Sequence, residues 1–323
     1  MFNYSNTYWK IIGKNNGNFP YHLGVNSLAE TGETFNAAPE CTPGGLYFTD
    51  IEHILEYREY GDKMCSLTIP PDAQVVAVDT KFKADKIEIL ELQPLDIPFL
   101  VERGANIHAR DDLPLRWSAE NGHLSVVQFL VEHGADVHAS DDWPLRLSAE
   151  NGHLPVVQFL VERGADVHAG DDWPLCWSAR NGHLPVVKFL VEHGANIHAC
   201  DDLPLCASAR NGHLPAVQFL VDHGANPAAR GNEAIKQAAK TGHFEIVAYL
   251  LQDSHVLAGP LPKPNLESNN PLARMLGEIL LRNITGRRSA EHFLESLHRS
   301  LTERQLISAI MSYHPHTRKS KRK

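Results

Sequence analysis

The chain has 323 residues, 43% of them apolar, and a formal net charge of −9 at pH 7. This length allows two or three domains, and the acidic balance argues against a general binder of nucleic acid or of anionic membranes. No segment reaches the roughly 20 apolar residues that cross a bilayer, and the N-terminus lacks the apolar run of a signal peptide. The five cysteines are widely spaced without a CxxC motif, so we expect reduced thiols in an intracellular protein.

Residues 1–95 show no internal repeat. Short strand-like runs, such as VVAV at 75–78, lie between turns rich in glycine and proline. The segment ECTPGGLYFTDIEHILEY at 40–57 predicts a turn, a strand and a helix in that order. We therefore predict a small α+β domain that caps the segment after it.

Four residues of this N-terminal domain could line a pocket: Tyr21, His22, Cys41 and His53. A Cys/His pair is a candidate nucleophile. No flanking signature accompanies this pair, so turn glycines and a packed cysteine explain the segment better.

A pattern of 30 residues recurs between residues 96 and 252. The signature NGHL returns at this spacing, and a TGHF variant follows at 241–244. A fixed period of this length is typical of a solenoid built from stacked repeats. The predicted units are a half repeat at 97–110, full repeats at 111–140, 141–170, 171–200 and 201–230, and a more polar capping repeat at 231–252.

Each unit predicts a pair of helices. The first follows the motif PLxxSAxN, with an aspartate pair ahead of it as N-cap candidates and proline in its first turn. The second follows LPVVQFLVEHG, in which Val127, Leu130 and Val131 have the i, i+3, i+4 spacing of one buried face. A glycine such as Gly134 then supplies a left-handed C-cap. One pair cannot bury its apolar face alone, so the units must stack.

The segment PLRLSAENGHLPVVQFLVERGADVHA resembles the ankyrin repeat over nearly its whole length. Ankyrin repeats run to about 33 residues, and the residues missing here fall where the family forms its projecting β-hairpin finger. The resemblance therefore implies a solenoid with short turns in place of fingers, and it implies binding of a protein partner elsewhere than on finger tips. Together with the N-terminal segment, the shortened unit resembles the ankyrin-repeat proteins that giant DNA viruses encode in families.

The composition changes again after the repeats. We predict a linker rich in proline and asparagine at 253–271, a helical segment at 272–316 and a disordered basic tail at 317–323. The tail is either a solvated end or a tag for nuclear import or for an acidic surface. The predicted fold is thus mainly α: an ankyrin-repeat solenoid with a small N-terminal α+β domain and a C-terminal helical segment.

Residues that can bind metals recur once per repeat. His123, His153, His183 and His213 lie on successive units, whose helices pack about 8–10 Å apart, whereas zinc needs its ligand nitrogens within about 2 Å. We therefore expect these histidines to bond loop backbone between units, and we expect no bound metal or other cofactor. The paired aspartates recur in the same way, which is typical of caps on a solvated edge; a ridge for a basic partner is the alternative.

Tryptophan supplies the candidate binding site. Trp117 and Trp177 share a repeat position with Leu147 and Ala207, and a packed core tolerates such a range of side-chain volumes poorly. In the ankyrin family this position on the first helix borders the concave surface, where an exposed aromatic residue is an interface anchor. Partial burial between units is the alternative. The other repeated tryptophan position, as at Trp173, is expected to fill space left by the shortened finger.

Charged residues on the same short helices would form a polar rim. Its sign would change along the array, from acidic to basic, and could orient a partner. The predicted rim residues are Arg116, Arg146, Glu120, Glu150, Arg180 and Arg210.

An array of stacked helix pairs offers a broad, rigid surface, and the chain has no Walker, GxGxxG, GxSxG or HExxH motif. We therefore predict a monomeric, non-catalytic scaffold or adaptor that binds a protein partner, and neither nucleic acid nor membrane, in the host cytoplasm or nucleus. The alternative is a small enzymatic or ligand-binding domain at residues 1–95 that the array directs to a target.

Overall fold

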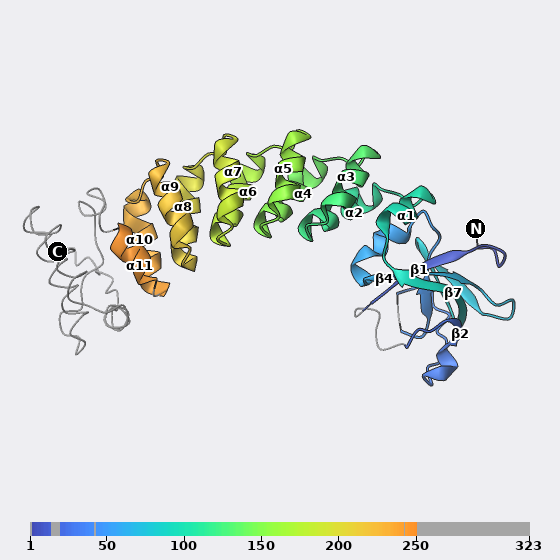
Figure 1. Cartoon of the computed structure of the whole chain (residues 1–323). Helices are drawn as coiled ribbons and strands as arrows, with labels where there is room; N and C mark the ends of the chain where they lie inside the picture. The colour runs from blue at the N-terminus through green and yellow to red at the C-terminus, as the bar shows by residue number, and fades with distance from the viewer. Residues whose placement is uncertain (1, 14–19, 42, 242, 251–323) are drawn as a thin grey trace, which may run out of the picture. The chain divides into compact units, whose positions relative to one another are not determined.

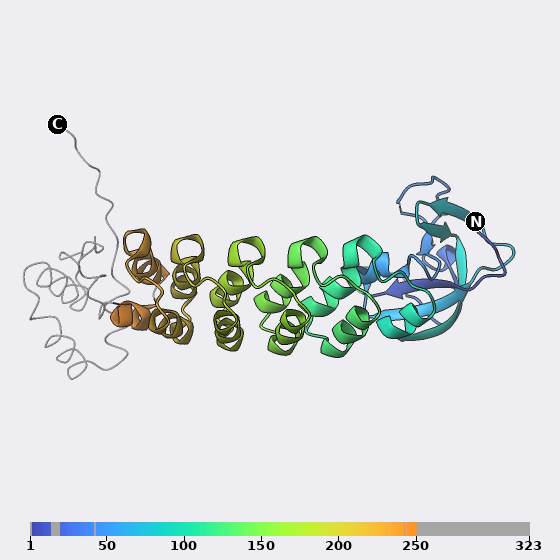
Figure 2. The same cartoon turned by 90° about the horizontal axis from the view of Figure 1, so that it is seen from above.

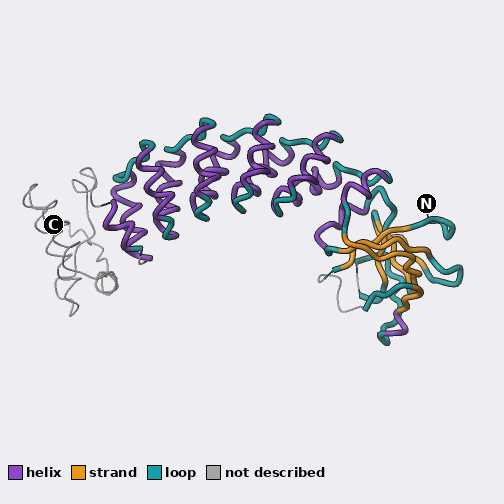
Figure 3. Tube along the Cα trace, in the orientation of Figure 1, coloured by secondary structure: helices purple, strands orange, loops and turns teal. Residues whose placement is uncertain are grey.

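A computed structural model describes residues 2–13, 20–41, 43–241 and 243–250. The predicted linker, C-terminal helical segment and basic tail lie outside the described residues. Strands are confined to the N-terminal part of the described chain, and α-helices begin at Ile97 (Figure 3). The contacts divide the chain into two units, residues 1–144 and 145–323.

The N-terminal part of the first unit contains two antiparallel sheets (Figure 1). One has four strands in the order β1-β4-β7-β2, and the other has three in the order β3-β6-β5. The predicted strand VVAV is β5. The bounds are β1 Tyr8–Ile12, β2 Gly24–Ser27, β3 Leu46–Phe48, β4 Lys63–Thr68, β5 Val75–Val78, β6 Lys81–Ala84 and β7 Lys86–Pro94.

Both sheets contribute to one apolar core. Tyr8 and Leu67 from the larger sheet are buried in one cluster with Leu46 and Phe48 from the smaller sheet. The rings of Tyr8 and Phe48 meet edge-on with their centroids 5.1 Å apart. In β3, buried Leu46 and Phe48 flank the less buried Tyr47, as expected for a strand with one face on the core, whereas β1 and β4 each bury four consecutive residues. Two 3₁₀ helices complete the domain, Leu28–Glu30 (η1) and Ile54–Tyr60 (η2), so the helix predicted after β3 is present as a 3₁₀ helix.

The first α-helix packs on the strand-containing part. Helix α1 (Ile97–Glu102) places the ring of Phe99 against Trp9 of β1, with the centroids 6.0 Å apart. The backbone N–H of Asn106 donates to the carbonyl of Glu52 over 3.0 Å. The predicted half repeat therefore shares an apolar and a hydrogen-bonded contact with the domain before it.

Each following repeat is a pair of helices, and within the second unit the pairs lie side by side (Figure 2). The helices fall where the 30-residue period places them. The first helices are α2 Ala109–Glu120, α4 Ala139–Glu150, α6 Ala169–Arg180, α8 Ala199–Asn211 and α10 Ala229–Thr241. The second helices are α3 Leu124–Glu132, α5 Leu154–Glu162, α7 Leu184–Glu192, α9 Leu214–Asp222 and α11 Phe244–Leu250.

A left-handed turn opens every first helix. In α6, for example, Gly170, Asp171 and Asp172 have φ values of 59°, 59° and 61°. Three consecutive residues in the left-handed region of φ/ψ space form a tight turn. Residues other than glycine adopt this region rarely. This turn occupies the place of the longer finger, as the shortened period predicts.

The second aspartate of each pair does not match the prediction of a solvated cap. Asp172 is 6% exposed, and its carboxylate accepts bonds from Nδ1 of His168 and from the backbone N–H of Asn196, over 3.0 and 2.7 Å. Asp202 bonds the N–H of Asn226 in the same way, over 2.8 Å. The carboxylate is buried because it hydrogen-bonds, from the turn that opens the first helix of one repeat, to the loop that precedes the first helix of the following repeat.

Glycines end both helices of a repeat. After α3, Gly134 has a φ of 101°, and the N–H of Ala135 bonds the carbonyl of Leu130 over 2.9 Å, the pattern of a Schellman cap. The glycine of the NGHL motif instead makes room for the next repeat. A Cβ on Gly182 would lie 2.4 Å from Nδ1 of His213.

Two of the recurring histidines, His183 and His213, contact backbone of the preceding repeat, as expected. Nε2 of His183 lies 2.9 Å from the carbonyl oxygen of Glu150 in the preceding repeat. Within the described residues, no three His, Cys, Asp or Glu side chains gather closely enough to hold a metal ion. No described helix is both long and apolar enough to cross a membrane.

Candidate functional site

A groove runs along the first helices of the last repeats in the second unit. Its volume is about 560 Å³, and α6, α8 and α10 supply its walls. A groove of this size suits side chains of a binding partner. The walls include Trp173, Trp177, Arg180, Leu203, Arg210 and Arg230.

Four side chains form a stack in which two indoles lie between two guanidinium groups. The guanidinium of Arg146 lies 5.2 Å from the ring centroid of Trp173, which meets Trp177 edge-on at 6.3 Å. The guanidinium of Arg180 lies 4.4 Å above the ring of Trp177. Cation–π and edge-to-face contacts of this kind hold aromatic rings in fixed orientations.

Helix α6 brings three of these residues onto one face. Trp173 and Trp177 are four residues apart, and Arg180 follows three residues later, so the helical period places all three in a row. Trp173 directly follows the left-handed turn and is 40% exposed. Helix α6 therefore presents an indole at the surface.

The groove carries an excess of positive charge. Arg180, Arg210 and Arg230 line it with one carboxylate, Glu233, which accepts a bond from Gln237. Within the described part of the chain, no ion pair engages Arg180 or Arg210, while Arg230 lies 3.9 Å from Asp201. Two exposed arginines that form no ion pair within the described residues favour an acidic ligand.

The two cysteines of the groove add no charge. Burial raises the pKa of the Cys176 thiol to about 12 and that of Cys206 to about 11. Both thiols stay protonated at neutral pH, so neither is an activated nucleophile.

Trp177, Arg180 and Arg210 lie together in this groove. Arg146, predicted as part of a polar rim, is 8% exposed, and its guanidinium lies against the ring of Trp173. Leu147 is half-buried on α4 and does not line the groove. Glu150 accepts bonds through its backbone carbonyl from Asn181 and His183.

The remaining predicted site residues belong to the first unit. Trp117 is half-buried and its ring lies 5.1 Å from that of His123. Arg116 donates to the carbonyl of Arg110 over 2.7 Å, and Glu120 is exposed at the end of α2.

Trp173 is not among the binding residues predicted from the sequence, which assigned its position to space beside the shortened turn. Among the exposed large apolar side chains of the described residues, Trp173 is the one that belongs to the repeats. The signal was present in its spacing of four residues from Trp177, which predicts adjacent indoles on one helix face.

Stacked helix pairs with a groove across their first helices define a repeat solenoid. Ankyrin repeats match the chain in three copies, at residues 95–171, 138–201 and 175–258, which together cover half of it. The chain therefore belongs to the ankyrin-repeat family.

Several relatives of this chain are proteins of a giant virus. An ankyrin repeat protein of Acanthamoeba polyphaga mimivirus is 32% identical over 121 residues, covering 33% of this chain and 38% of the relative. An uncharacterized protein of the same virus is 33% identical over 119 residues, covering 34% of this chain and 84% of the relative. A further mimivirus ankyrin repeat protein is 34% identical over 134 residues, with 40% of its length covered. The matches thus span less than half of the first and third of these relatives.

Proposed function

We propose that the chain is a non-catalytic scaffold that binds a protein partner through the groove on α6, α8 and α10. Ankyrin repeats are in general protein-interaction modules, and the family membership supports this class of function. The partner segment we propose combines acidic side chains with an aromatic or aliphatic anchor. An adaptor role, in which the bound protein is presented to a second protein, is part of the same proposal.

The observation that carries the proposal is the stack of Arg146, Trp173, Trp177 and Arg180. The stack leaves Trp173 40% exposed, and tryptophan and arginine are the residues that dominate binding energy at interfaces. Because the stack is already ordered, a partner loses little side-chain entropy by packing against it.

A peptide-display selection against the full chain tests this proposal. We expect enriched peptides to carry Asp or Glu beside a Trp, Phe or Leu. Binding of a selected peptide is then measured by fluorescence anisotropy. Trp173→Ala should weaken it roughly 30-fold, as loss of an interface anchor does, and Arg180→Ala about tenfold.

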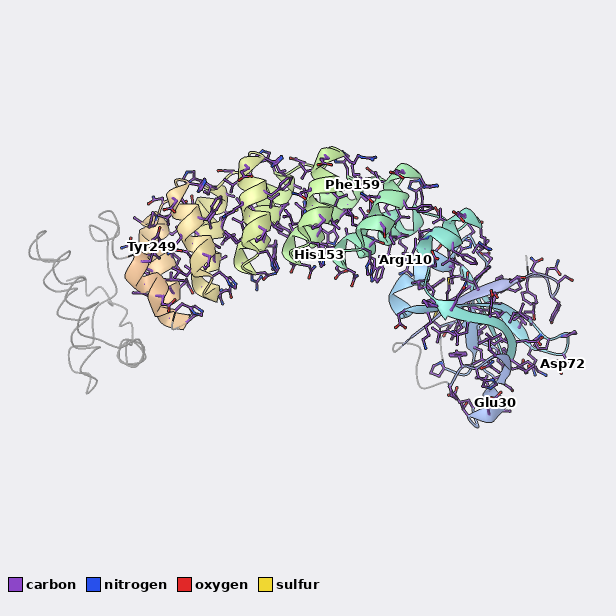
Figure 4. The ribbon with its side chains drawn as sticks, in the orientation of Figure 1. Glu30, Asp72, Arg110, His153, Phe159 and Tyr249 are labelled. Atoms are coloured by element: carbon purple, nitrogen blue, oxygen red, sulfur yellow. The ribbon has the colours of Figure 1, made fainter. Side chains whose placement is uncertain are left out.

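Arg163→Ala is a matched control for Arg180→Ala. Arg163 directly follows α5, and its guanidinium lies 4.7 Å from the ring centroid of Phe159, which Figure 4 labels on α5. Neither residue lines the groove. This change should leave peptide binding within about twofold, since it removes a cation–π contact without touching the groove. Equal losses in the two arginine variants, or enriched peptides without acidic residues, would contradict the proposal.

A further inference from the structure

Three lysines from two strands gather around one tyrosine in the N-terminal domain. Nζ of Lys10, on β1, donates to the carbonyl of Tyr47 over 2.7 Å. Lys81 and Lys83, on β6, place their ammonium groups 4.9 and 6.0 Å from the Tyr47 ring centroid. Lys83 also donates to the carbonyl of Glu40 over 3.2 Å.

A pocket opens beside this cluster. Its volume is about 260 Å³, which is the size of a substituted ring rather than of an extended peptide. The apolar part of its wall consists of Trp9, Ile11, Phe48 and Ile54, and the polar part includes Lys10, Lys81, Cys41 and Thr49.

The pocket wall is held in place by hydrogen bonds. The hydroxyls of Tyr57 and Thr80 lie 2.6 Å apart, and that of Thr80 donates to Glu56 over 2.9 Å. The hydroxyl of Tyr47 donates to the carbonyl of Glu40 over 3.2 Å. Both tyrosine rings are therefore anchored at their outer ends.

Lys81 sits between these two anchored rings. Its ammonium lies 4.9 Å from the centroid of Tyr47 and 5.0 Å from that of Tyr57. The faces of the two aromatic rings attract the ammonium group between them. Within the described residues, no carboxylate forms an ion pair with Lys81 or Lys10, and none lines the pocket.

The side chain of Lys10 is shielded from water, and within the described residues it forms no ion pair with a carboxylate. It is 7% exposed, and burial lowers its pKa to about 8, with the charge of Lys81 as a smaller contribution in the same direction. Two ammonium groups that repel each other at the wall of an apolar pocket are stabilised by an anion placed beside them.

We propose that this pocket binds a small organic anion. Its phosphate or carboxylate group pairs with Lys81 and Lys10, and its ring packs against Trp9, Phe48 and Ile54. The inference uses no residue of the groove on the repeats and stands independently of the proposed function.

Calorimetric titration of the full chain tests the charge requirement. Phenyl phosphate and benzoate are the anionic probes, and benzyl alcohol is the neutral one. We expect at least one anion to bind and the alcohol not to bind; the stronger anion identifies phosphate or carboxylate as the preferred group. Lys81→Gln should weaken that anion about tenfold, the loss of one charge-assisted contact, while Lys81→Arg retains binding.

Lys63→Gln is the control, because Lys63 is exposed on β4 and does not line the pocket. It should leave the affinity unchanged. The proposal is overturned if the alcohol binds as well as both anions, if neither anion binds, or if the Lys63 and Lys81 variants lose equal affinity.

A second measurement on the unmodified chain locates the bound anion. Cys41 is exposed and lines the pocket, whereas Cys200 is exposed on the repeats. Saturating anion should slow alkylation of Cys41 by iodoacetamide, followed peptide by peptide with mass spectrometry, and leave the rate at Cys200 unchanged. Equal rates at Cys41 with and without the anion would place any binding outside this pocket and overturn the proposal.

Discussion

At the scale of single residues, two kinds of glycine recur in the repeats and carry different constraints. Gly182 and Gly194 both have positive φ, 76° and 96°, but a Cβ on Gly182 would meet the ring of His213 whereas one on Gly194 would meet nothing within 4 Å. Gly194→Ala should cost about 1 kcal/mol of backbone strain. Gly182→Ala should cost roughly 1–3 kcal/mol more through the steric conflict. Urea denaturation of both variants measures the difference, and equal losses would mean that the ring of His213 moves aside freely.

Also at this scale, His213 links stability to pH. Burial is the largest cause that lowers its pKa, and the neighbouring His183 and His243 act in the same direction. The folded state therefore binds fewer protons than the unfolded chain, so the stability is present above about pH 6.5 and is lost as the pH falls below it. His213→Gln should reduce the drop in melting temperature between pH 7.5 and 5.5. His223→Gln, at an exposed histidine, is the control and should keep the full drop.

At the scale of elements, buried aspartates connect successive first helices. Asp172→Ala would remove the buried carboxylate that accepts from the N–H of Asn196, which should cost about 1–3 kcal/mol. Asp171→Ala, at the exposed neighbour, should change the free energy of unfolding by less than about 0.5 kcal/mol. Chemical denaturation of the pair separates the two roles. Similar changes in the free energy of unfolding at both positions would mean that both aspartates act as solvated caps.

At the scale of the whole molecule, a solenoid transmits damage only to neighbouring repeats. Leu175 is fully buried on α6, and Leu175→Ala should cost roughly 2–5 kcal/mol. Hydrogen exchange should rise in α6 and in the helices packed on it, while amides of β1, β4 and β7 keep their protection. Faster exchange by the same factor in those strands would show that the chain unfolds as one cooperative block.

The sequence alone determined what depends on local periodicity. The 30-residue period located the helix pairs, because the same spacing of apolar residues recurs in every repeat. The glycines that follow the helices marked the left-handed caps. The run VVAV identified β5 through its strand propensity. The short segment before PL indicated a compact turn in place of a finger.

Only the tertiary structure decided which side chains are open and which meet. Arg146 and Asp172 are charged residues that pattern assigns to the surface, yet partners from other loops and helices bury both. Trp173 is apolar yet exposed, although Trp143, which follows the same left-handed turn in another repeat, is half-buried. Lys10 and Tyr47 are 37 residues apart and touch only because β1 and β3 fold together. Such contacts form between segments that are far apart in the sequence. No local pattern of residues specifies how close those segments come in the folded chain.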